Sequence, residues 1–331
     1  MIVLGIESSC DDTSAAIYDG KTLRSNVVST QYIHKQFGGV VPELASRAHI
    51  QWILPVIREA LKKAEMDLQK IEGIAVTYGP GLAGSLLVGL STAKGIALSL
   101  GLPFIGINHL EGHIWANAIE NPELEPPFVT LIVSGGHTQL VYVHTWGEYR
   151  VLGRTRDDAA GEAFDKVAKL LGLKFPGGPE IERMAEQGNA DAIPFPRAFL
   201  EPGSFDFSFS GLKTAVLNYV KEIGEEKARV QLPDICASFQ KAVVEVLVEK
   251  SVWAAEHTGV KAIAVGGGVA MNHALQNALQ NAGKAKGMRV FFPPPRFCTD
   301  NAAMIAIAGH YHLSRGESSP LSLAVIPSLN L

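Results

Sequence analysis

A strand–turn–strand design occurs twice in this chain, and this repeat constrains the fold more than any other feature. In residues 2–19 an apolar strand enters a Ser-rich acidic turn and returns as a strand, and residues 128–145 do the same around a small polar turn. Helix-like periodicity over residues 43–65 and 83–100 separates further strand-like runs, such as residues 73–78. Strands that alternate with helices predict an α/β fold in two related halves, with a ligand cleft between them.

The length of 331 residues suggests two domains, and an apolar content of 47% is ample for a large core. Three prolines within residues 121–128 indicate a linker. We therefore expect an N-terminal domain over residues 1–125 and a C-terminal domain over residues 126–300. The second domain is expected to contain a mostly helical insertion at about residues 155–250, and the segment from about 300 to 331 to pack on the first domain.

Composition and charge predict a reduced, cytoplasmic protein. The three cysteines are far apart and form no CxxC pair. The N-terminus lacks the pattern of a signal peptide. The apolar stretch 85–107 is interrupted by Lys94 and Pro103, which favours a buried helix and strand over a membrane span. Since the net charge is −4, a nucleic-acid partner would need a local basic patch or a second protein to present it.

Glycine-rich turns at residues 133–139 and 265–272 each follow an apolar strand. Their unshielded backbone N–H groups can hold a phosphate or a nucleoside. Each turn alone can be an ordinary hairpin turn or helix start, but the pair in a duplicated chain favours a nucleotide site. The turn GPGLAG at 79–84 matches G-x-G-x-x-G, yet the next strand, 103–108, lacks the carboxylate that holds a ribose in a dinucleotide-binding fold. A tight turn is therefore the preferred interpretation there.

His109 and His113 lie four residues apart, directly after a strand-like run. A helix would place both on one face and offer two imidazole nitrogens to one metal ion, although such pairs also occur by chance. Asp300 follows another strand-like segment and would complete a ligand set that suits iron or zinc. An apolar helix begins just after Asp300, so this residue is also a candidate helix N-cap, and both roles can hold.

The order H-L-E-G-H argues against a metalloprotease. In the protease motif H-E-x-x-H, the glutamate lies near the metal side of the helix and acts as a general base. Glu111 instead sits two residues from each histidine, about 200° around the helix from either, and is expected to point away.

Ten segments form a recognisable series: ESSCDDT, GGVVPELASRAH, GPGLAGSLLVG, NHLEGH, LIVSGGHTQL, DDAAGEAFDKVAKLLGL, FPGGP, FSFSGLKT, GGGVAMN and FCTDNAAMIA. Together and in this order, over about residues 1–310, they resemble the universal tRNA N6-adenosine threonylcarbamoyltransferase family. O-sialoglycoprotein endopeptidase, or glycoprotease, is an older name for that family. GGVVPELASRAH and FSGLKT resemble its bacterial branch in particular.

The resemblance implies an actin/Hsp70/sugar-kinase-like fold, in which two duplicated subdomains surround a nucleotide cleft. It implies that threonylcarbamoyl-AMP, a mixed anhydride made by a separate synthase, is the substrate. The threonylcarbamoyl group would pass to N6 of adenosine 37 in tRNAs that read codons beginning with A, with release of AMP. The family's bacterial members work with a related non-catalytic paralogue and a small ATPase, so these proteins and tRNA are the expected partners.

For the metal, the resemblance makes His109, His113 and Asp300 the ligands of one divalent ion, Fe(II) or Zn(II). Archaeal members add a tyrosine where this chain has Ile132, which leaves the fourth position to substrate or water. Their SGGN turn is SGGH here, and the role of His137 stays open.

For the substrate, or an ATP-, ADP- or AMP-type nucleotide, the resemblance points to the second half of the chain. Asp165, Gly178 and Asn272 would hold the adenosine part, and Glu182 would match an acidic ribose contact of archaeal relatives. The phosphate and acyl region would be lined by Ile132, Val133, Ser134, Gly135 and Gly136.

The chemistry of these residues agrees with acyl transfer. A metal held by two histidines and an aspartate can polarise the carbamoyl carbonyl, and glycine-turn N–H groups can hold the AMP leaving group. No residue is assigned as the general base. A kinase of the same fold is an alternative, but it would need Mg²⁺ held largely by oxygen ligands. A scaffold that only recruits partners is another, and it would have no need of a metal site.

Overall fold

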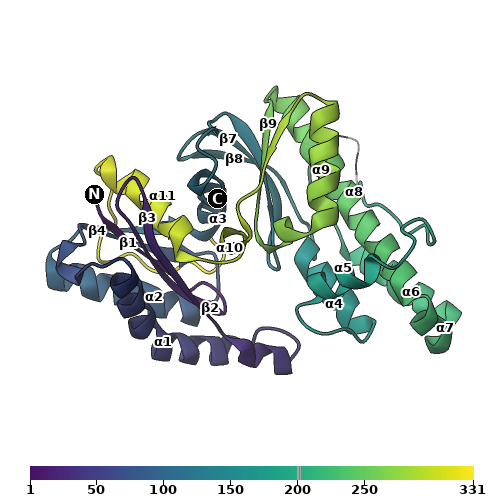
Figure 1. Ribbon diagram of the computed structural model, residues 1–331, viewed down its shortest axis with the longest axis horizontal. Coiled ribbons are helices and arrows are strands. Elements are labelled where there is room, and N and C mark those ends of the chain that lie inside the picture. The colour runs from purple at the N-terminus through teal and green to yellow at the C-terminus, as the bar shows by residue number, and fades with distance from the viewer. Residues whose placement is uncertain (200, 202) are drawn as a thin grey trace. The chain divides into compact units, whose positions relative to one another are not determined.

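The computed structural model describes residues 1–199, 201 and 203–331, and these form two compact units (Figure 1). The first unit contains residues 1–122 and 293–331, and the second contains residues 123–292. The chain thus leaves the first unit after Pro122 and returns to it at Pro293.

A five-stranded mixed sheet forms the centre of the first unit. Its order is β3-β2-β1-β4-β5, in which β1, β2 and β3 are antiparallel neighbours while β4 and β5 run parallel to β1. The strands are β1 (Val3–Glu7), β2 (Asp12–Tyr18), β3 (Leu23–Thr30), β4 (Gly73–Gly79) and β5 (Phe104–Asn108). Since β1, β4 and β5 are parallel, their carboxyl ends meet at one edge of the sheet.

Helices cover both faces of this sheet (Figure 1). On one face lie α1 (Pro42–Lys63) and α2 (Ala83–Leu100), which pack on β2 and β4, and on the other lies α11 (Ala302–Ser314), which packs on β1 and β4. The buried residues of α1 recur at helical spacing and join the apolar core. The remaining helices of the unit are α3 (His109–Trp115), α10 (Pro295–Cys298) and the 3₁₀-helices η1 (Tyr32–Gln36), η2 (Leu68–Lys70) and η3 (Ala116–Ile119).

Helix α2 confirms the predicted helix followed by a strand, but it is buried along one face only, and Leu87 and Leu98 are exposed. It ends at Gly101 in the left-handed conformation, and β5 follows. Among the described residues it is the one helix that is long and apolar enough to cross a membrane by length and composition. Core helices of α/β proteins meet the same criterion, and one face of α2 is buried against β4 and α1.

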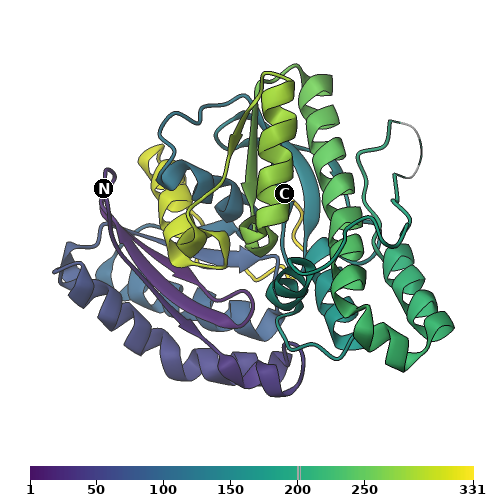
Figure 2. The ribbon, with the colours of Figure 1, turned by 45° about the vertical axis from the view of Figure 1, so that its right-hand side comes forward.

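The second unit is built around a sheet of order β10-β9-β6-β7-β8. Its strands are β6 (Phe128–Val133), β7 (Thr138–Thr145), β8 (Glu148–Arg154), β9 (Ala262–Gly266) and β10 (Arg289–Phe291). Helices α8 and α9 run side by side, with α8 on β6 and β9 and α9 on β10 (Figure 2). The helices are α4 (Ala160–Leu170), α5 (Gly177–Ala185), α6 (Ser210–Ile223), α7 (Glu225–Val230), α8 (Leu232–Thr258), η4 (Gly268–Met271) and α9 (His273–Ala285).

The two sheets have the same topology, which confirms the predicted duplication. In each, an antiparallel run of three consecutive strands is extended by two later strands that run parallel to the first. The third strands, β3 and β8, are not predicted from the sequence. Both are outer strands with many exposed or half-exposed residues, so they lack the apolar run or the strict alternation that marks a strand.

The packing of α11 on β1 depends on a glycine. A Cβ atom on Gly5 would lie 2.5 Å from the carbonyl oxygen of Ala302 and 2.6 Å from the nitrogen of Ala306. Helix α11 therefore rests directly on the backbone of β1, and the residues that begin this helix are held close to the end of the strand.

Gly5→Ala is expected to lower the free energy of unfolding by about 1–3 kcal/mol, because the added methyl group overpacks this contact. Urea unfolding would measure it. Gly95→Ala is the matched control: Gly95 is an exposed residue of α2 with no atom within 4 Å of an added Cβ. It is expected to raise stability by about 0.5–1 kcal/mol. Equal effects of the two substitutions would contradict the close packing of α11.

Candidate functional site

The histidine pair lies where β5 becomes α3. Asn108 ends the strand and caps the helix, since its side chain accepts a hydrogen bond of 2.8 Å from the backbone nitrogen of Leu110. His109 and His113 are therefore one helical turn apart, as expected. Their ring centroids are 4.7 Å apart and the ring planes are nearly perpendicular, at 84°. Both residues are buried.

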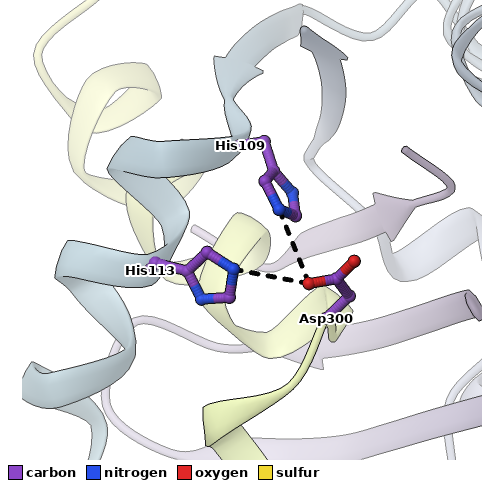
Figure 3. Close-up of side chains that lie close together, drawn as sticks. All are labelled: His109, His113 and Asp300. Atoms are coloured by element: carbon purple, nitrogen blue, oxygen red, sulfur yellow. Dashed lines mark ion pairs between the residues drawn. The ribbon is translucent and has the colours of Figure 1, made fainter. Parts of the chain in front are cut away.

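Asp300 comes from the other end of the chain, in the turn between α10 and α11. A Cβ atom on Gly112, which lies between the two histidines, would be 2.9 Å from Ile305 of α11. The glycine thus permits the close approach of α3 and α11. In Figure 3 His109 and His113 point from α3 toward the Asp300 carboxylate.

The alternative role of Asp300 as a helix N-cap is wrong. Asn301 caps α11, accepting a hydrogen bond from the nitrogen of Met304. Its amide also donates to the carbonyl oxygens of Phe297 and Thr299, and the residue is fully buried. Asn301 therefore caps the helix, while the Asp300 side chain faces the two histidines.

The three side chains form a group with the character of a metal site. Asp300 Oδ1 lies 3.5 Å from His109 Nε2 and 3.3 Å from His113 Nε2, and all three potential ligand atoms are within 4.8 Å of one another. Both ring nitrogens of His113 are buried without a hydrogen-bond partner. A buried imidazole that lacks such a partner is costly, and coordination of a cation would satisfy it. Two imidazoles and a carboxylate fit Fe(II) or Zn(II).

One buried carboxylate, Glu7, and two half-buried ones, Asp12 and Asp300, place negative charge around this group. Burial, followed by the charge of Asp300, raises the pKa of Asp12 to about 7. Burial alone would lower the pKa of His109, but the carboxylates of Asp300 and Glu7 outweigh it and raise that pKa to about 9. An excess of negative charge in a buried site favours a bound cation.

Glu7 is a residue of this site that sequence reasoning missed. It is fully buried at the end of β1, and its Oε2 lies 3.0 Å from His109 Nδ1. Burial alone would raise the pKa of a carboxyl group, yet the adjacent His109 keeps the pKa of Glu7 below its ordinary value. The signal was a carboxylate at the end of a buried strand, in the motif ESSCDDT, but no local pattern pairs it with His109.

Glu111 does not belong to the group, as predicted. Its side chain accepts a hydrogen bond of 2.8 Å from His312 Nε2. The tight-turn interpretation of residues 79–84 also agrees with the structure. A Cβ atom on Gly81 would lie 2.6 Å from the carbonyl oxygen of Ser9, and Gly81 has φ of +156°. The glycine is thus required by packing within the first unit.

In the second unit, the two predicted glycine turns touch each other. A Cβ atom on Gly267, after β9, would lie 2.4 Å from the carbonyl oxygen of Val133 at the end of β6. Ile132 and Val133 are fully buried strand residues, so their side chains belong to the core. Gly135 and Gly136 are exposed, and nothing lies within 4 Å of a Cβ on either. Bare backbone is therefore accessible at this turn.

Hydrogen bonds of Ser134 and Gly161 fix the turn between β6 and β7. Ser134 closes the β6–β7 turn: its nitrogen donates to the carbonyl oxygen of His137, and its hydroxyl accepts from the His137 nitrogen. The start of α4 packs against the same turn, since the nitrogen of Gly161 donates to the carbonyl oxygen of Ser134.

Asp165 on α4 is bonded to the start of α5, the helix that contains Gly178. Asp165 Oδ1 accepts a hydrogen bond of 2.6 Å from the nitrogen of Gly177, and burial raises the pKa of the carboxyl group. Gly178 has open space where a side chain would be.

Glu182 and Asn272 meet at the start of α9. Glu182 Oε1 accepts from the nitrogen of His273, and Asn272 caps the helix through the nitrogen of Leu275. Asn272 also donates to Gln240. The side chains of both expected ligand-binding residues thus have partners within the protein.

The fold and the site define a class: an α/β protein with two duplicated sheets, a buried His–His–Asp group and paired glycine turns. Two solved structures are similar to the chain in fold but have little sequence identity to it. Full-length HypF in its phosphate- and nucleotide-bound form has a TM-score of 0.67 at 14% identity, over 96% of this chain and 47% of HypF. The activator of 2-hydroxyisocaproyl-CoA dehydratase from Clostridium difficile, with bound ADPNP, has a TM-score of 0.55 at 14% identity, over 98% and 100%. These likenesses support the predicted actin/Hsp70/sugar-kinase-like fold.

The chain belongs to the tRNA N6-adenosine threonylcarbamoyltransferase family, whose sequence profile matches residues 22–307. Curated relatives with that name are similar over the full length. One from Clostridium perfringens (strain SM101 / Type A) is 52% identical, over 100% of this chain and 98% of the relative. One from Moorella thermoacetica is 54% identical, over 99% and 97%. The chain is therefore a transferase that forms N6-threonylcarbamoyladenosine in tRNA, as predicted.

Asn301→Ala is expected to lower the free energy of unfolding by about 1–2 kcal/mol, because it removes the cap of α11. Asp300→Ala is expected to cost less, since Asp300 caps no helix: the loss of its ion pairs with the histidines is offset in part by the relief of repulsion with Glu7 and Asp12. Urea unfolding of both variants with EDTA present would measure the difference. An equal loss would mean that Asp300 is part of the cap.

The contribution of His312 to stability is expected to depend on pH. Burial alone would lower the pKa of His312, but hydrogen bonds to Glu111 and Glu317 raise it above the ordinary value of 6.5. Charged His312 therefore stabilises the fold fully below about pH 6.5, and this effect is lost as the pH rises through the raised folded-state pKa.

His312→Gln is accordingly expected to cost about 1–3 kcal/mol at pH 6 and less at pH 9, measured by urea unfolding. His144→Gln, in an exposed position of β7, is the control. The same loss for His312→Gln at both pH values would exclude a contribution from its charge.

Proposed function

We propose that this transferase uses threonylcarbamoyl-AMP as donor and adenosine 37 of tRNAs reading codons that begin with A as acceptor, at a site with one divalent metal. The metal would be Fe(II) or Zn(II), held by His109, His113 and Asp300. The observation that carries the proposal is the convergence of two imidazole nitrogens and a carboxylate oxygen within 4.8 Å of one another.

The reaction is an acyl transfer between two nucleotides. The lone pair of N6 attacks the carbamoyl carbon, the bond from that carbon to the phosphate oxygen breaks, and AMP leaves with the electron pair while N6 loses one proton. When bound, the metal supplies a Lewis acid for the carbonyl oxygen. His109, His113 and Asp300 position that charge, and no residue is assigned as the base that takes the proton.

The second unit would hold the nucleotide part of the donor. Backbone N–H groups of residues 132–136 would face the phosphate and acyl region, because Gly135 and Gly136 leave this turn open. Asp165 and Gly178 would contact the adenosine. HypF and the dehydratase activator, which share the fold, have nucleotides bound.

Glu182 and Asn272 complete the proposed nucleotide site. Their side chains are fixed by hydrogen bonds at the start of α9, which holds them in place for a ribose or base. An ATP-, ADP- or AMP-type nucleotide would use the same contacts.

Partner proteins are part of the proposal. With a net charge of −4 the chain has little general attraction for the tRNA backbone. A non-catalytic paralogue of the same fold and a small ATPase would assist it, and a separate synthase would supply threonylcarbamoyl-AMP. These reactions would take place in the cytoplasm.

The test is transfer of radiolabelled threonine from threonylcarbamoyl-AMP to tRNA by the purified chain with candidate partners. His109→Ala is expected to lower the rate about 100-fold or more, since a metal contributes several kcal/mol to the transition state. His144→Ala and a tRNA with guanosine at position 37 are the controls: the first should leave the rate unchanged and the second should remain unlabelled.

The outcomes separate the parts of the proposal. Equal labelling of tRNA by wild type and His109→Ala would support the transferase activity but contradict a role for the metal in it. Absence of labelling with every partner combination, while threonylcarbamoyl-AMP still binds, would favour a scaffold role.

A further inference from the structure

The two histidines of the proposed metal site are held in different ways. His109 Nδ1 lies 3.0 Å from Glu7 Oε2 and 3.1 Å from Ser9 Oγ. Neither nitrogen of His113 has a hydrogen-bond partner. The protein thus orients the His109 imidazole by hydrogen bonds through Nδ1, whereas the His113 imidazole is held by packing and by its ion pair with Asp300.

The Glu7 carboxylate is itself fixed by neighbours other than His109. Its Oε1 accepts a hydrogen bond of 2.5 Å from the nitrogen of Ser9, and its Oε2 accepts one of 2.6 Å from the Thr77 hydroxyl on β4. The side chain is fully buried, so water does not compete for either oxygen. Glu7 is therefore a rigid acceptor beside His109.

We propose that Glu7 is a positioning residue that keeps the proton of neutral His109 on Nδ1 and so leaves the Nε2 lone pair for the metal. The inference rests on the proposed metal site. A carboxylate has only acceptor oxygens, so the facing Nδ1 has to be the donor. Nε2 also lies 3.5 Å from a carboxylate oxygen, Oδ1 of Asp300, but Asp300 is itself an expected ligand, so a metal bound between them would take the place of a proton on Nε2. Neutral imidazole carries a single N–H, which then remains on Nδ1 beside Glu7. Ser9 Oγ can donate or accept and agrees with either tautomer.

Glu7→Gln makes the proposal testable, because the neighbours decide which way the amide turns. The nitrogen of Ser9 is a donor facing the Oε1 position, so the amide oxygen is expected to stay there. The NH₂ group then replaces Oε2 and donates toward His109 Nδ1. Nδ1 becomes the acceptor, the proton moves to Nε2, and the ligand atom is blocked.

The experiment measures the affinity of the whole protein for Zn²⁺ alone, by competition with a chromophoric chelator. Glu7→Gln is expected to bind zinc about 10–100-fold more weakly than wild type. Glu111→Gln is the matched control, because it removes another buried carboxylate, on α3 between the two histidines, whose oxygen accepts a hydrogen bond from His312. Its affinity is expected to stay within about 3-fold of wild type, on the ordinary scatter of such effects. Wild-type affinity in Glu7→Gln would overturn the inference.

His109→Ala separates this inference from the proposed function. If wild type and His109→Ala bind zinc equally, or if neither binds it, the metal site itself is wrong. If His109→Ala loses binding while Glu7→Gln keeps it, only the positioning role of Glu7 fails.

A measurement on the wild-type protein decides the matter even where Glu7→Gln does not fold. In the zinc-loaded protein with ¹⁵N-labelled histidine, NMR is expected to show the His109 proton on Nδ1, protected from exchange with water. A proton on Nε2, with zinc on Nδ1, would overturn the inference.

Discussion

The close contact between β1 and α11 is the constraint on which the candidate site depends. Gly5 lets the first turn of α11 rest on the backbone of the strand, and Gly112 lets α3 approach the same helix. Three segments that are far apart in the chain thereby meet at one sheet edge, and each carries one part of the site: Glu7, the histidine pair and Asp300. A side chain at Gly5 would overlap the backbone of α11, so the absence of a side chain there is what allows this contact.

The packing of these segments brings several carboxylates close to the histidine pair. Glu7, Asp12 and Asp300 bring negative charge into a region largely shielded from water, where unbalanced charges are costly. The His109 imidazole, whose pKa is raised, offsets part of that charge, and a divalent cation would offset more. The hydrogen bond from Thr77 and the one from the Ser9 nitrogen hold the Glu7 carboxylate, so the site is supported by β1 and β4 as well as by α3.

Duplication provides two equivalent sheet edges with different chemistry. At the carboxyl end of β1 in the first unit stands Glu7, and at the equivalent end of β6 in the second unit stands an open glycine turn. In the first unit, imidazoles and carboxylates therefore lie at the end of the strands. In the second unit, exposed backbone N–H groups lie at the equivalent place.

The sequence by itself determined the features that repeat over a few residues. Alternating strands and helices predicted the α/β halves, and the spacing of His109 and His113 placed both on one helix face. Only the tertiary structure decided which of Asp300 and Asn301 caps α11, and that Glu7 faces His109 from about one hundred residues away along the chain. It also revealed β3 and β8, whose half-exposed residues carry no clear period. The physical reason is that periodicity is a local property, whereas hydrogen-bond partners and close backbone approaches depend on how distant segments pack.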